Sequence, residues 1–429
     1  MLPLLKKIIS AVLTWEARMV IAKYHPVIIA VTGSVGKTST KDAIFTVLSP
    51  SFFVRKSEKS FNSDIGVPLT ILGLENGWYD PIAWLKNMFK GLDLIFFPHH
   101  YPRILVLEVG ADRPGDIKAI AEWLSPDIVV LTRFPDVPAH VEFFSSPDEV
   151  IAEKGYLVKS LKEKGLLVFN SDDEKTASLR SLTKAPGMSY GFNQGNNVQA
   201  SYADIIYEER IPKGMVFRVN YQGKSAPVRL KGVLGRQQIY STLAALAVGF
   251  SQGLNIVKAA ETFEKALFAP GRMRIIEGMN NSLVIDDTYN SSPVALKEAL
   301  FTLQTISVSG RKIAVLADML ELGKYSIVEH RNAGKMAAVM CDTLVSVGTR
   351  ARMMDIGAEG KRMGKRKRLQ FQTSTEAGAY LKTVLARGDM VLVKGSQSMR
   401  MEKVVEALMA HPEQKEKLLV RQEREWQRK

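Results

Sequence analysis

The sequence predicts an α/β protein with two domains, each built on a mainly parallel sheet. One observation is a series of short apolar runs between about residue 27 and residue 180, which alternate with stretches of helical apolar spacing. A second series of the same kind spans residues 283–395. The third is a glycine-rich turn, Gly-Ser-Val-Gly-Lys-Thr at 33–38, directly after the first apolar run. These features predict a central P-loop-type parallel-sheet domain and a smaller C-terminal Rossmann-like α/β domain.

The first 26 residues mix apolar and basic side chains at helical spacing, as in LLKKIISAVLTWEARMVIAKY. This pattern predicts an amphipathic basic helix, which either packs against its own domain, the alternative we favour, or lies on an anionic membrane surface. No apolar stretch is long enough to span a bilayer, and no cleavable signal is evident. The single cysteine, Cys341, suits a reducing compartment. We therefore expect a cytoplasmic protein, with peripheral membrane contact through residues 1–25 as the alternative.

The predicted central domain covers residues 27–269. Its clearest strands are VIIAVT at 27–32, RILVLEV at 103–109, DIVVLT at 127–132 and GLLVFN at 165–170. Residues 197–231 change to strand alternation with turn residues, which predicts a small antiparallel insertion, and helical patterns resume at 236–267. The segment FAPGRMR at 268–274 is typical of a hinge between domains.

The predicted C-terminal domain covers residues 270–429. Its strands are LVIDDT at 283–288, KIAVLA at 312–317, TLVSVG at 343–348 and MVLVKG at 390–395. Ligands are expected at the carboxyl ends of the strands and in the cleft between the domains. Part of the net charge of +14 is local, because KRMGKRKR at 361–368 predicts a basic loop or strand edge and residues 413–429 predict a solvated helix. No aromatic residue interleaves with the 361–368 cluster, so we expect no nucleic-acid partner. Separately, we expect the protein to be a monomer.

The turn at 33–38 carries the clearest chemistry in the sequence. Gly33 and Gly36 permit a backbone path that points N–H groups at phosphate oxygens, and the helix that follows adds its positive N-terminal end. Lys37 would reach the outer phosphates, and the hydroxyl of Thr38 would bind Mg²⁺. Glu108 ends the strand RILVLEV, where its carboxylate would face the same turn from a neighbouring strand.

The turn and eight other segments resemble the Mur ligase family, and most of all its D-alanyl-D-alanine-adding members. The segments occur in the family's order along nearly the whole chain: TGSVGKTST, FNSDIGVPLTIL, LEVGADRPGDI, AHVEFF, EKGYL, PGRM, DDTYNSSP, ADMLELG and KGSQSMRME. An ordered set of this kind is far more specific than any one of its members. The resemblance identifies residues 27–269 as an ATP-binding domain.

The resemblance also implies roles for individual residues. The ATP-binding residues would be Gly33, Ser34, Val35, Gly36, Lys37, Thr38, Ser39, Gln238, Arg272, Asp287 and Asn290. Two Mg²⁺ sites would be formed by Thr38, Glu108, His140 and Lys154. Lys37, His140 and a carbamoylated Lys154 would be catalytic. The other two substrates would contact Asn62, Ser63, Lys394, Ser396 and Arg400. Carbamoylation requires a neutral amine, so Lys154 should be desolvated or lie near other positive charge.

The implied reaction is ATP-dependent amide synthesis through an acyl phosphate. The expected substrates are a UDP-muramoyl-peptide or related carboxylate and a D-alanyl-D-alanine-like amine. Two departures from the family pattern bear on this expectation. Gly235-Arg236-Gln237-Gln238 replaces Gly-x-His-Asn, and only about 26 residues precede the first strand, so we expect the usual N-terminal UDP-binding domain to be absent.

Two alternative functions follow from these departures and from the charge. One is a Mur-like ligase that joins another amino acid or peptide to a different acceptor, including a lipid-linked one. The other is a P-loop NTPase with a regulatory or nucleic-acid-associated role. A ligase should release phosphate only with both a carboxylate and an amine, whereas the NTPase should respond to polynucleotide.

Overall fold

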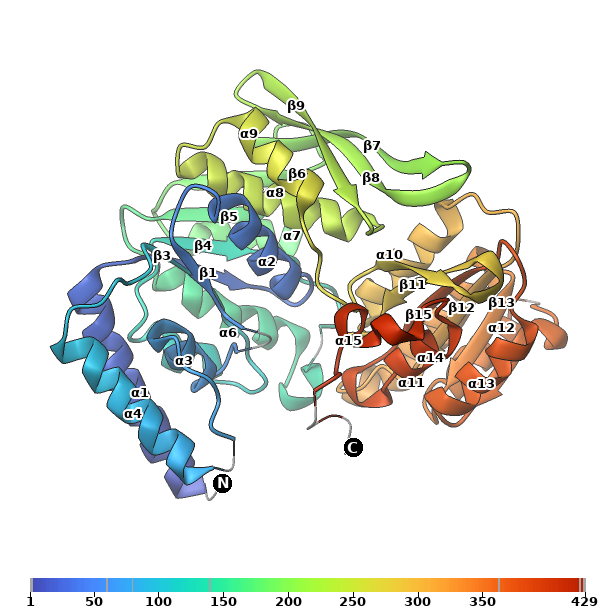
Figure 1. Ribbon diagram of the computed structural model, residues 1–429, viewed down its shortest axis with the longest axis horizontal. Helices are drawn as coiled ribbons and strands as arrows, with labels where there is room; N and C mark the ends of the chain where they lie inside the picture. Colours follow the sequence, from blue (N-terminus) through green and yellow to red (C-terminus); the bar gives the residue numbers. More distant parts are fainter. Residues whose placement is uncertain are drawn as a thin grey trace.

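The computed structural model of the chain describes residues 3–58, 61–78, 80–138, 140–361, 363–423 and 426. Two sheets organise this part of the chain (Figure 1). The larger sheet has nine strands in the order β2-β3-β1-β4-β5-β6-β7-β8-β9, and the smaller has six in the order β10-β11-β15-β12-β13-β14. We call the parts built on them the central unit and the C-terminal unit. The predicted α/β fold with two sheets is confirmed.

The first six strands of the central sheet run parallel. They are β1 (Val27–Thr32), β2 (Val54–Lys56), β3 (Ile104–Glu108), β4 (Ile128–Leu131), β5 (Leu166–Asn170) and β6 (Gly187–Gly191). Val31 lies opposite Glu108 and Thr32 lies opposite Leu131, so the carboxyl ends of β1, β3 and β4 meet at one edge. All four strands predicted for this region are present.

The antiparallel segment at 197–231 extends the central sheet rather than standing apart from it. Its strands are β7 (Val198–Glu208), β8 (Ile211–Tyr221) and β9 (Lys224–Lys231). β7 pairs parallel to β6 through Tyr190 and Val198, which makes the sheet continuous. The hairpin of β7 and β8 reaches over the C-terminal unit, where the hydroxyl of Tyr207 accepts the backbone N–H of Ser307 at 2.9 Å (Figure 1).

Helices cover both faces of the central sheet. Their bounds are α1 (Pro3–Tyr24), α2 (Lys37–Leu48), α3 (Gly66–Leu72), α4 (Pro81–Phe96), α5 (Asp116–Ala121), α6 (Pro147–Lys159), α7 (Glu174–Ser178), α8 (Arg236–Ser251) and α9 (Ile256–Glu261), with short 3₁₀ turns η1 (Val141–Phe143), η2 (Leu179–Leu182) and η3 (Thr262–Lys265). α2 and α8 share one hydrophobic cluster with one face of the sheet, and α1, α3 and α6 share a second cluster with the other. Burying both faces explains why the central strands are almost entirely apolar.

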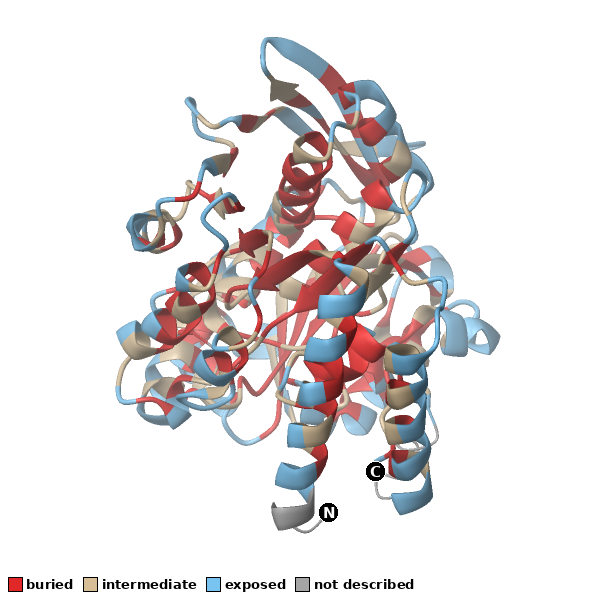
Figure 2. Cartoon of the chain, turned by 90° about the vertical axis from the view of Figure 1, so that its left-hand side faces the viewer, coloured by how far each residue is buried: buried red, intermediate tan, exposed pale blue. Residues whose placement is uncertain are grey.

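The N-terminal helix α1 packs against its own unit. Ile9, Leu13, Ala17 and Val20 are buried in the same cluster as residues of β1 and β3, and α1 lies beside α3 and α4. Figure 2 shows this helix with one buried side and one exposed side. The predicted packing of this helix against its own domain is observed. Among the described residues, none of the helices has the length and apolar character needed to cross a bilayer.

The C-terminal unit is a six-stranded sheet with helices around it. Its strands are β10 (Arg274–Gly278), β11 (Ser282–Asp287), β12 (Lys312–Ala317), β13 (Thr343–Val347), β14 (Arg368–Phe371) and β15 (Met390–Lys394). Its helices are α10 (Pro293–Thr305), α11 (Ser326–Met340), α12 (Arg352–Glu359), α13 (Ser374–Val384), α14 (Glu402–Leu408) and α15 (Lys415–Leu418), with turns η4 (Met279–Asn281), η5 (Gly323–Tyr325), η6 (Lys365–Lys367), η7 (Gln397–Met399) and η8 (Pro412–Gln414). Only β10 runs antiparallel to its neighbour. The basic cluster lies at η6 and the edge strand β14, as predicted, with Arg362 outside the described residues.

The helix predicted for 413–429 is present only as the turn η8 and the short helix α15, and the prediction is wrong for 419–423; residues 424, 425 and 427–429 lie outside the described residues. α15 ends at Leu418, and the chain then turns inward, where Leu419 and Arg421 are buried. The guanidinium of Arg421 lies 2.9 Å from Oε2 of Glu402 and also donates to the backbone carbonyl of Thr288 at 3.1 Å. Because these partners are far away in the sequence, the helical pattern of the tail gave no sign that this arginine would leave the helix.

Candidate active site

A cavity of about 420 Å³ lies between the two units, beside the carboxyl ends of β1 and β3. The predicted residues that line it are Ser34, Val35, Gly36, Lys37, Thr38, Ser39, Asn62, Glu108, His140, Gln238, Arg272, Asp287, Asn290 and Lys394. Five predicted residues do not line it: Gly33, Ser63, Lys154, Ser396 and Arg400. The structure therefore brings most of the predicted residues together in one place.

The conformation of the glycine-rich turn is constrained by its neighbours Thr132 and Arg133. Gly33 has φ of 144°, and a Cβ there would collide with the hydroxyl of Thr132, so only glycine fits. The backbone N–H groups of Ser34 and Val35 both donate to the carbonyl oxygen of Arg133, at 2.9 and 3.4 Å. These two N–H groups therefore do not point at a phosphate, which differs from our expectation for the turn.

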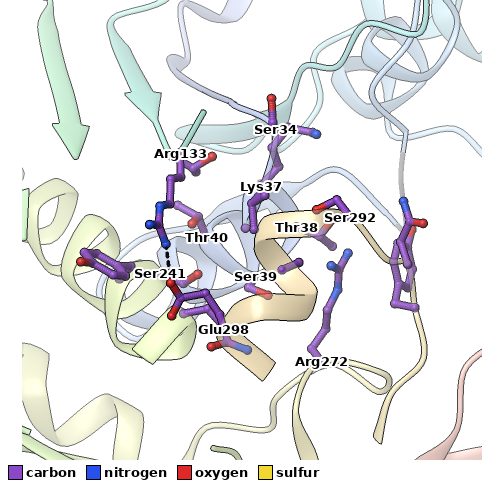
Figure 3. A pocket seen from close by; sticks show the side chains of 18 of the residues that line it. Ser34, Lys37, Thr38, Ser39, Thr40, Arg133, Ser241, Arg272, Ser292 and Glu298 are labelled. Carbon is purple, nitrogen blue, oxygen red and sulfur yellow. Dashed lines mark hydrogen bonds and ion pairs between the residues drawn. The ribbon is translucent and has the colours of Figure 1, made fainter. Parts of the chain in front are cut away.

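The N–H groups left for an anion are those at the start of α2. Gly36, with φ of 86°, occupies the N-cap position, and no side chain caps the helix. The first N–H groups of a helix have no acceptor within the helix, and the helix dipole adds partial positive charge there. This end of α2 faces the cavity together with Lys37 and Thr38 (Figure 3). The geometry suits a phosphate.

Two lysines of the central unit are desolvated close to each other. Burial lowers the pKa of Lys37 below its usual value, against the opposing effect of Glu108. Burial also lowers the pKa of Lys154, on α6, from 10.5 to about 7, and the positive charge of Lys37 acts in the same direction. Lys154 is only 3% exposed. A largely neutral amine near neutral pH is the condition that carbamoylation needs.

Glu108 is the clearest indication of a cation site. The residue is 2% exposed, and its Oε1 lies 3.4 Å from Nδ2 of Asn62. Its Oε2 is buried without a hydrogen-bond partner. An ionised carboxylate is costly to bury unless it is paired or binds a metal. Glu108 and the hydroxyl of Thr38 are hard oxygen donors of the kind that Mg²⁺ prefers, so the residues present fit this ion.

His140, the predicted ligand of a second metal, is paired across the cleft in this structure. Its Nδ1 lies 2.7 Å from Oε2 of Glu321 in the C-terminal unit, and its Nε2 lies 3.9 Å from Oδ1 of Asp112. Hydrogen bonding to His140 lowers the pKa of Glu321 below its usual value. No group of three or more His, Cys, Asp or Glu side chains in the described ranges could hold a metal. A metal at His140 would thus need further ligands, such as a modified Lys154.

The segment between the units contributes Arg272. Its guanidinium lies 3.9 Å from the centre of the Tyr289 ring, and its Nε is buried without a hydrogen-bond partner. Figure 3 shows this side chain pointing toward Thr38 and Ser292. Gln238, predicted to bind ATP, donates its amide N–H to the carbonyl of Arg272 at 2.7 Å, which links it to the hinge. Arg272 is well placed for the phosphates of a nucleotide.

Predicted residues of the C-terminal unit are bound to one another. Nζ of Lys394 lies 2.5 Å from Oδ2 of Asp287 and donates to the carbonyl of Asn290 at 3.0 Å. Both charged side chains are buried. Ser292 is the N-cap residue of α10 with Pro293 next to it, although its hydroxyl makes no capping hydrogen bond.

Three residues predicted to contact substrate serve the fold in this structure. The hydroxyl of Ser396 accepts the backbone N–H of Leu320 at 2.9 Å. Arg400 lies 2.5 Å from Glu402, away from the cavity. The hydroxyl of Ser63 lies 3.4 Å from the N–H of Gly66 at the start of α3. None of them lines the cavity, because these local partners hold each side chain in place.

Several residues in the cleft were not predicted from the sequence. Arg133, after β4, lies 3.0 Å from Glu298 of α10, so it joins the two units beside the turn (Figure 3). Tyr289 and Glu321 also line the cavity. Tyr289 and Glu321 occur inside the matched segments DDTYNSSP and ADMLELG, which was the available signal. Arg133 and Glu298 lie in no such segment.

Comparison with known families accounts for this arrangement. Residues 87–249 match the Mur ligase middle domain, and residues 271–397 match the Mur ligase glutamate ligase domain. The chain belongs to the Mur ligase family, whose members use ATP, and the resemblance seen in the sequence is confirmed.

Similar proteins in two bacteria are named UDP-N-acetylmuramoyl-tripeptide–D-alanyl-D-alanine ligase. The protein of Mycobacterium tuberculosis is 30% identical over 402 residues, which cover 89% of this chain and 73% of that protein. The protein of Bacillus subtilis is 27% identical over 387 residues, covering 90% of this chain and 76% of that protein.

Solved structures of MurF show the same fold. The structure from Thermotoga maritima in complex with ADP has a TM-score of 0.75 and 24% identity, and covers 93% of this chain and 83% of its own. A structure from Acinetobacter baumannii has a TM-score of 0.75 and 24% identity, covering 92% of this chain and 79% of its own.

Proposed function

We propose that the protein is an ATP-dependent amide ligase that adds D-alanyl-D-alanine to UDP-N-acetylmuramoyl-tripeptide. The observation that carries this proposal is the unpartnered oxygen of Glu108 beside Lys37 and the start of α2, in a cleft between two units. Such a site suits a magnesium-bound nucleotide next to a second substrate. The names of the relatives supply the identity of the other two substrates.

In the first step, an oxygen of the tripeptide carboxylate attacks the γ-phosphorus of ATP. The bond from that phosphorus to the bridging oxygen breaks, and the products are an acyl phosphate and ADP. Lys37 and the N–H groups of α2 hold the phosphates, while Arg272 approaches them from the hinge. These groups position the reactants and neutralise negative charge, which is most of what phosphoryl transfer requires.

In the second step, the amine of D-alanyl-D-alanine attacks the acyl carbon. The carbon–oxygen bond to phosphate breaks, phosphate departs with the electron pair, and the nitrogen loses a proton. The cavity is bounded by both units, so closure would exclude water that could hydrolyse the acyl phosphate.

Mg²⁺ would be held by Thr38 and Glu108, with a second ion at His140 and carbamoylated Lys154. When bound, the ions withdraw charge from the phosphate oxygens. Two observations support these metal sites. Glu108 has a buried carboxylate oxygen without a hydrogen-bond partner, and Lys154 has a desolvated amine that could be carbamoylated.

The proposal also includes the domain bounds, the oligomeric state and the location of the protein. The chain would divide into the helix at 1–26, a central ATP-binding domain at 27–269 and a C-terminal domain at 270–429, and it would act as a monomer in the cytoplasm. Peripheral contact of residues 1–25 with a membrane is a separate proposal, which depends on the outer surface of α1 and α4 and not on the cleft.

The test is phosphate release by the purified protein with Mg²⁺-ATP, UDP-N-acetylmuramoyl-tripeptide and D-alanyl-D-alanine, each omitted in turn. We expect release only with the full set, together with the amide product by mass spectrometry. Polynucleotide in place of the two peptides should give none. Release without product, or release driven by polynucleotide, would overturn the proposal in favour of another NTPase.

A further inference from the structure

An exposed apolar stripe runs along the whole of α4. Ile82, Leu85, Phe89 and Phe96 are 64%, 55%, 64% and 71% exposed. Their spacing of three, four and seven residues places them on one side of the helix. Surface helices of a soluble domain usually show charged residues on that side, so this pattern points to a partner.

A second stripe follows the outer side of α1. Ile8, Trp15 and Met19 are 51%, 49% and 41% exposed, and their spacing also fits one side of a helix. The opposite side of α1 holds the buried residues that pack into the central unit. The two helices lie side by side, and Nζ of Lys23 donates to the carbonyl of Leu94 at 3.0 Å where both helices end.

We call the outward sides of these helices the α1–α4 face, defined by Ile8, Trp15, Met19, Ile82, Leu85, Phe89 and Phe96. α4 lies beside α1 (Figures 1 and 2), and α1 and α3 are the helices of the described chain that pack against it. The face lies at the end of the central unit far from the C-terminal unit (Figure 1). Anything bound there would leave the cleft open.

The charge around the face is basic. Lys7 and Arg18 of α1 are exposed, as are Lys86 and Lys90 of α4. The acidic residues of the two helices are Glu16, which is buried, and Asp93, which lies 3.0 Å from Nε2 of His99. An apolar stripe with flanking lysines and little exposed acid complements a surface that is apolar below and anionic at its edge.

We infer that the α1–α4 face binds the surface of an anionic lipid bilayer, with both helices lying in the plane of the interface. Helices of 22 and 16 residues extend about 33 and 24 Å at about 1.5 Å per residue, so the face can cover several lipid headgroups. The aromatic and aliphatic side chains enter the boundary between headgroups and acyl chains, and the lysines contact headgroup phosphates. The described helices do not cross the bilayer.

The test is co-sedimentation of the full chain with vesicles of phosphatidylglycerol and phosphatidylcholine, and with vesicles of phosphatidylcholine alone. We expect binding to the anionic vesicles and a loss of at least about tenfold in partitioning for the double variant Phe89→Glu/Phe96→Glu. The matched control is Ile327→Glu/Val339→Glu, which places the same charges at two exposed aliphatic positions of α11. This control should bind as the wild type does.

A second variant tests the charge. Lys86→Glu/Lys90→Glu should lower partitioning onto anionic vesicles about tenfold, whereas Lys365→Glu/Lys367→Glu, in the basic cluster of η6, should change it little. Failure of the wild type to bind vesicles would overturn the inference, as would equal loss in both control variants. So would a dimer that Phe89→Glu/Phe96→Glu dissociates without any vesicle binding, because a second copy would then be the occupant. Phosphate release should survive in every variant, which separates this result from that of the proposed function.

Discussion

The two sides of the cleft differ in whether their buried charged side chains are paired. We call these sides the two walls of the cleft. On the central unit, Lys37 and Lys154 are desolvated, and one oxygen of Glu108 has no partner. On the C-terminal unit, Asp287 is paired with Lys394 at 2.5 Å, and, outside the lining of the cavity, Glu402 lies 2.9 Å from Arg421.

The difference shows which wall depends on a ligand. Charges that are paired within the protein keep a loop in place, whereas unpaired buried charges are stabilised when a cation or a phosphate supplies the missing partner. On the C-terminal side, Ser291 Oγ fits this interpretation, because it has no hydrogen-bond partner and belongs to a residue that lines the cavity, whereas the Nε atoms of Arg368 and Arg421, which also lack a hydrogen-bond partner, do not. Ser34, Glu108, Gln237, Arg272 and Ser291 each combine a buried atom without a hydrogen-bond partner with a place in the cavity lining, whereas Glu16, Thr32, Arg368 and Arg421 have such atoms away from the cavity.

The largest effect on stability should come from removing the ion pair between Lys394 and Asp287 on the C-terminal wall. Lys394→Met leaves Asp287 buried without its partner, and we expect the free energy of unfolding to fall by about 3–5 kcal/mol. Urea denaturation measures the change. Lys382→Met, at an exposed position of α13, is the control and should stay within about 0.5 kcal/mol of the wild type. A similar small change in both variants would mean that the pair does not hold this wall.

The opposite wall should respond differently to the same kind of substitution. Lys37→Met removes a desolvated ammonium, so the ligand-free protein should be no less stable than the wild type. Phosphate release should fall by about 10²–10³-fold, because a charge aimed at the transferring phosphate is lost. Urea denaturation and the phosphate assay on one preparation check both results. A large loss of stability would show that Lys37 is structural.

The pH dependence of stability should also separate the walls. Lys154 has a pKa of about 7 in the folded protein, against a usual value of 10.5, so the unfolded chain binds more protons between these values. The resulting stabilisation is complete above pH 10.5 and is lost as pH falls through 7, with a slope of at most about 1.4 kcal/mol per pH unit. Lys154→Met should flatten the rise in unfolding free energy between pH 7 and 9.

The control for this measurement is Lys159→Met, at an exposed position of the same helix α6. It should keep the wild-type slope. If Lys154→Met keeps that slope too, the amine of Lys154 is not desolvated, and the physical basis for its carbamoylation is lost.

The smallest effect should come from the contact that joins the walls. Arg133 and Glu298 lie 3.0 Å apart and are both partly exposed, so a double-mutant cycle of Arg133→Gln and Glu298→Gln should give a coupling of only about 0.2–1 kcal/mol. The backbone carbonyl of Arg133, which holds the turn, is unchanged by these substitutions. A coupling well above this range would mean that the two walls are not independent.

The sequence predicted which residues meet at the carboxyl ends of the central strands. It did not predict the partners of the charged side chains. Apolar runs such as VIIAVT identify buried strands, and parallel pairing brings Lys37 and Glu108 to one edge, so this half of the site could be predicted. The positions of Arg400 and Ser396 could not be predicted. Arg400 contacts Glu402 and Ser396 contacts Leu320, and these contacts depend on tertiary packing.

The same limit explains the tail and the segment at 197–231. Arg421 leaves its predicted helix for distant carbonyl and carboxylate partners that no local pattern reveals. Strand alternation predicted the antiparallel hairpins, but only the pairing of β6 with β7 shows that they belong to the central sheet.

The hydrogen bond between Tyr207 and Ser307 bears on how the two units can move. The chain connects the units once through 266–273, and the tip of the β7–β8 hairpin touches the C-terminal unit at a separate place. The ion pairs Arg133–Glu298 and His140–Glu321 also join the units, at the cleft. If opening breaks these contacts at the cleft, the linker and the hairpin remain as two attachments, and a rigid body held at both turns about the line between them. Opening would then follow one rotational path, and the ease of that rotation would determine how quickly ADP and the finished peptide escape.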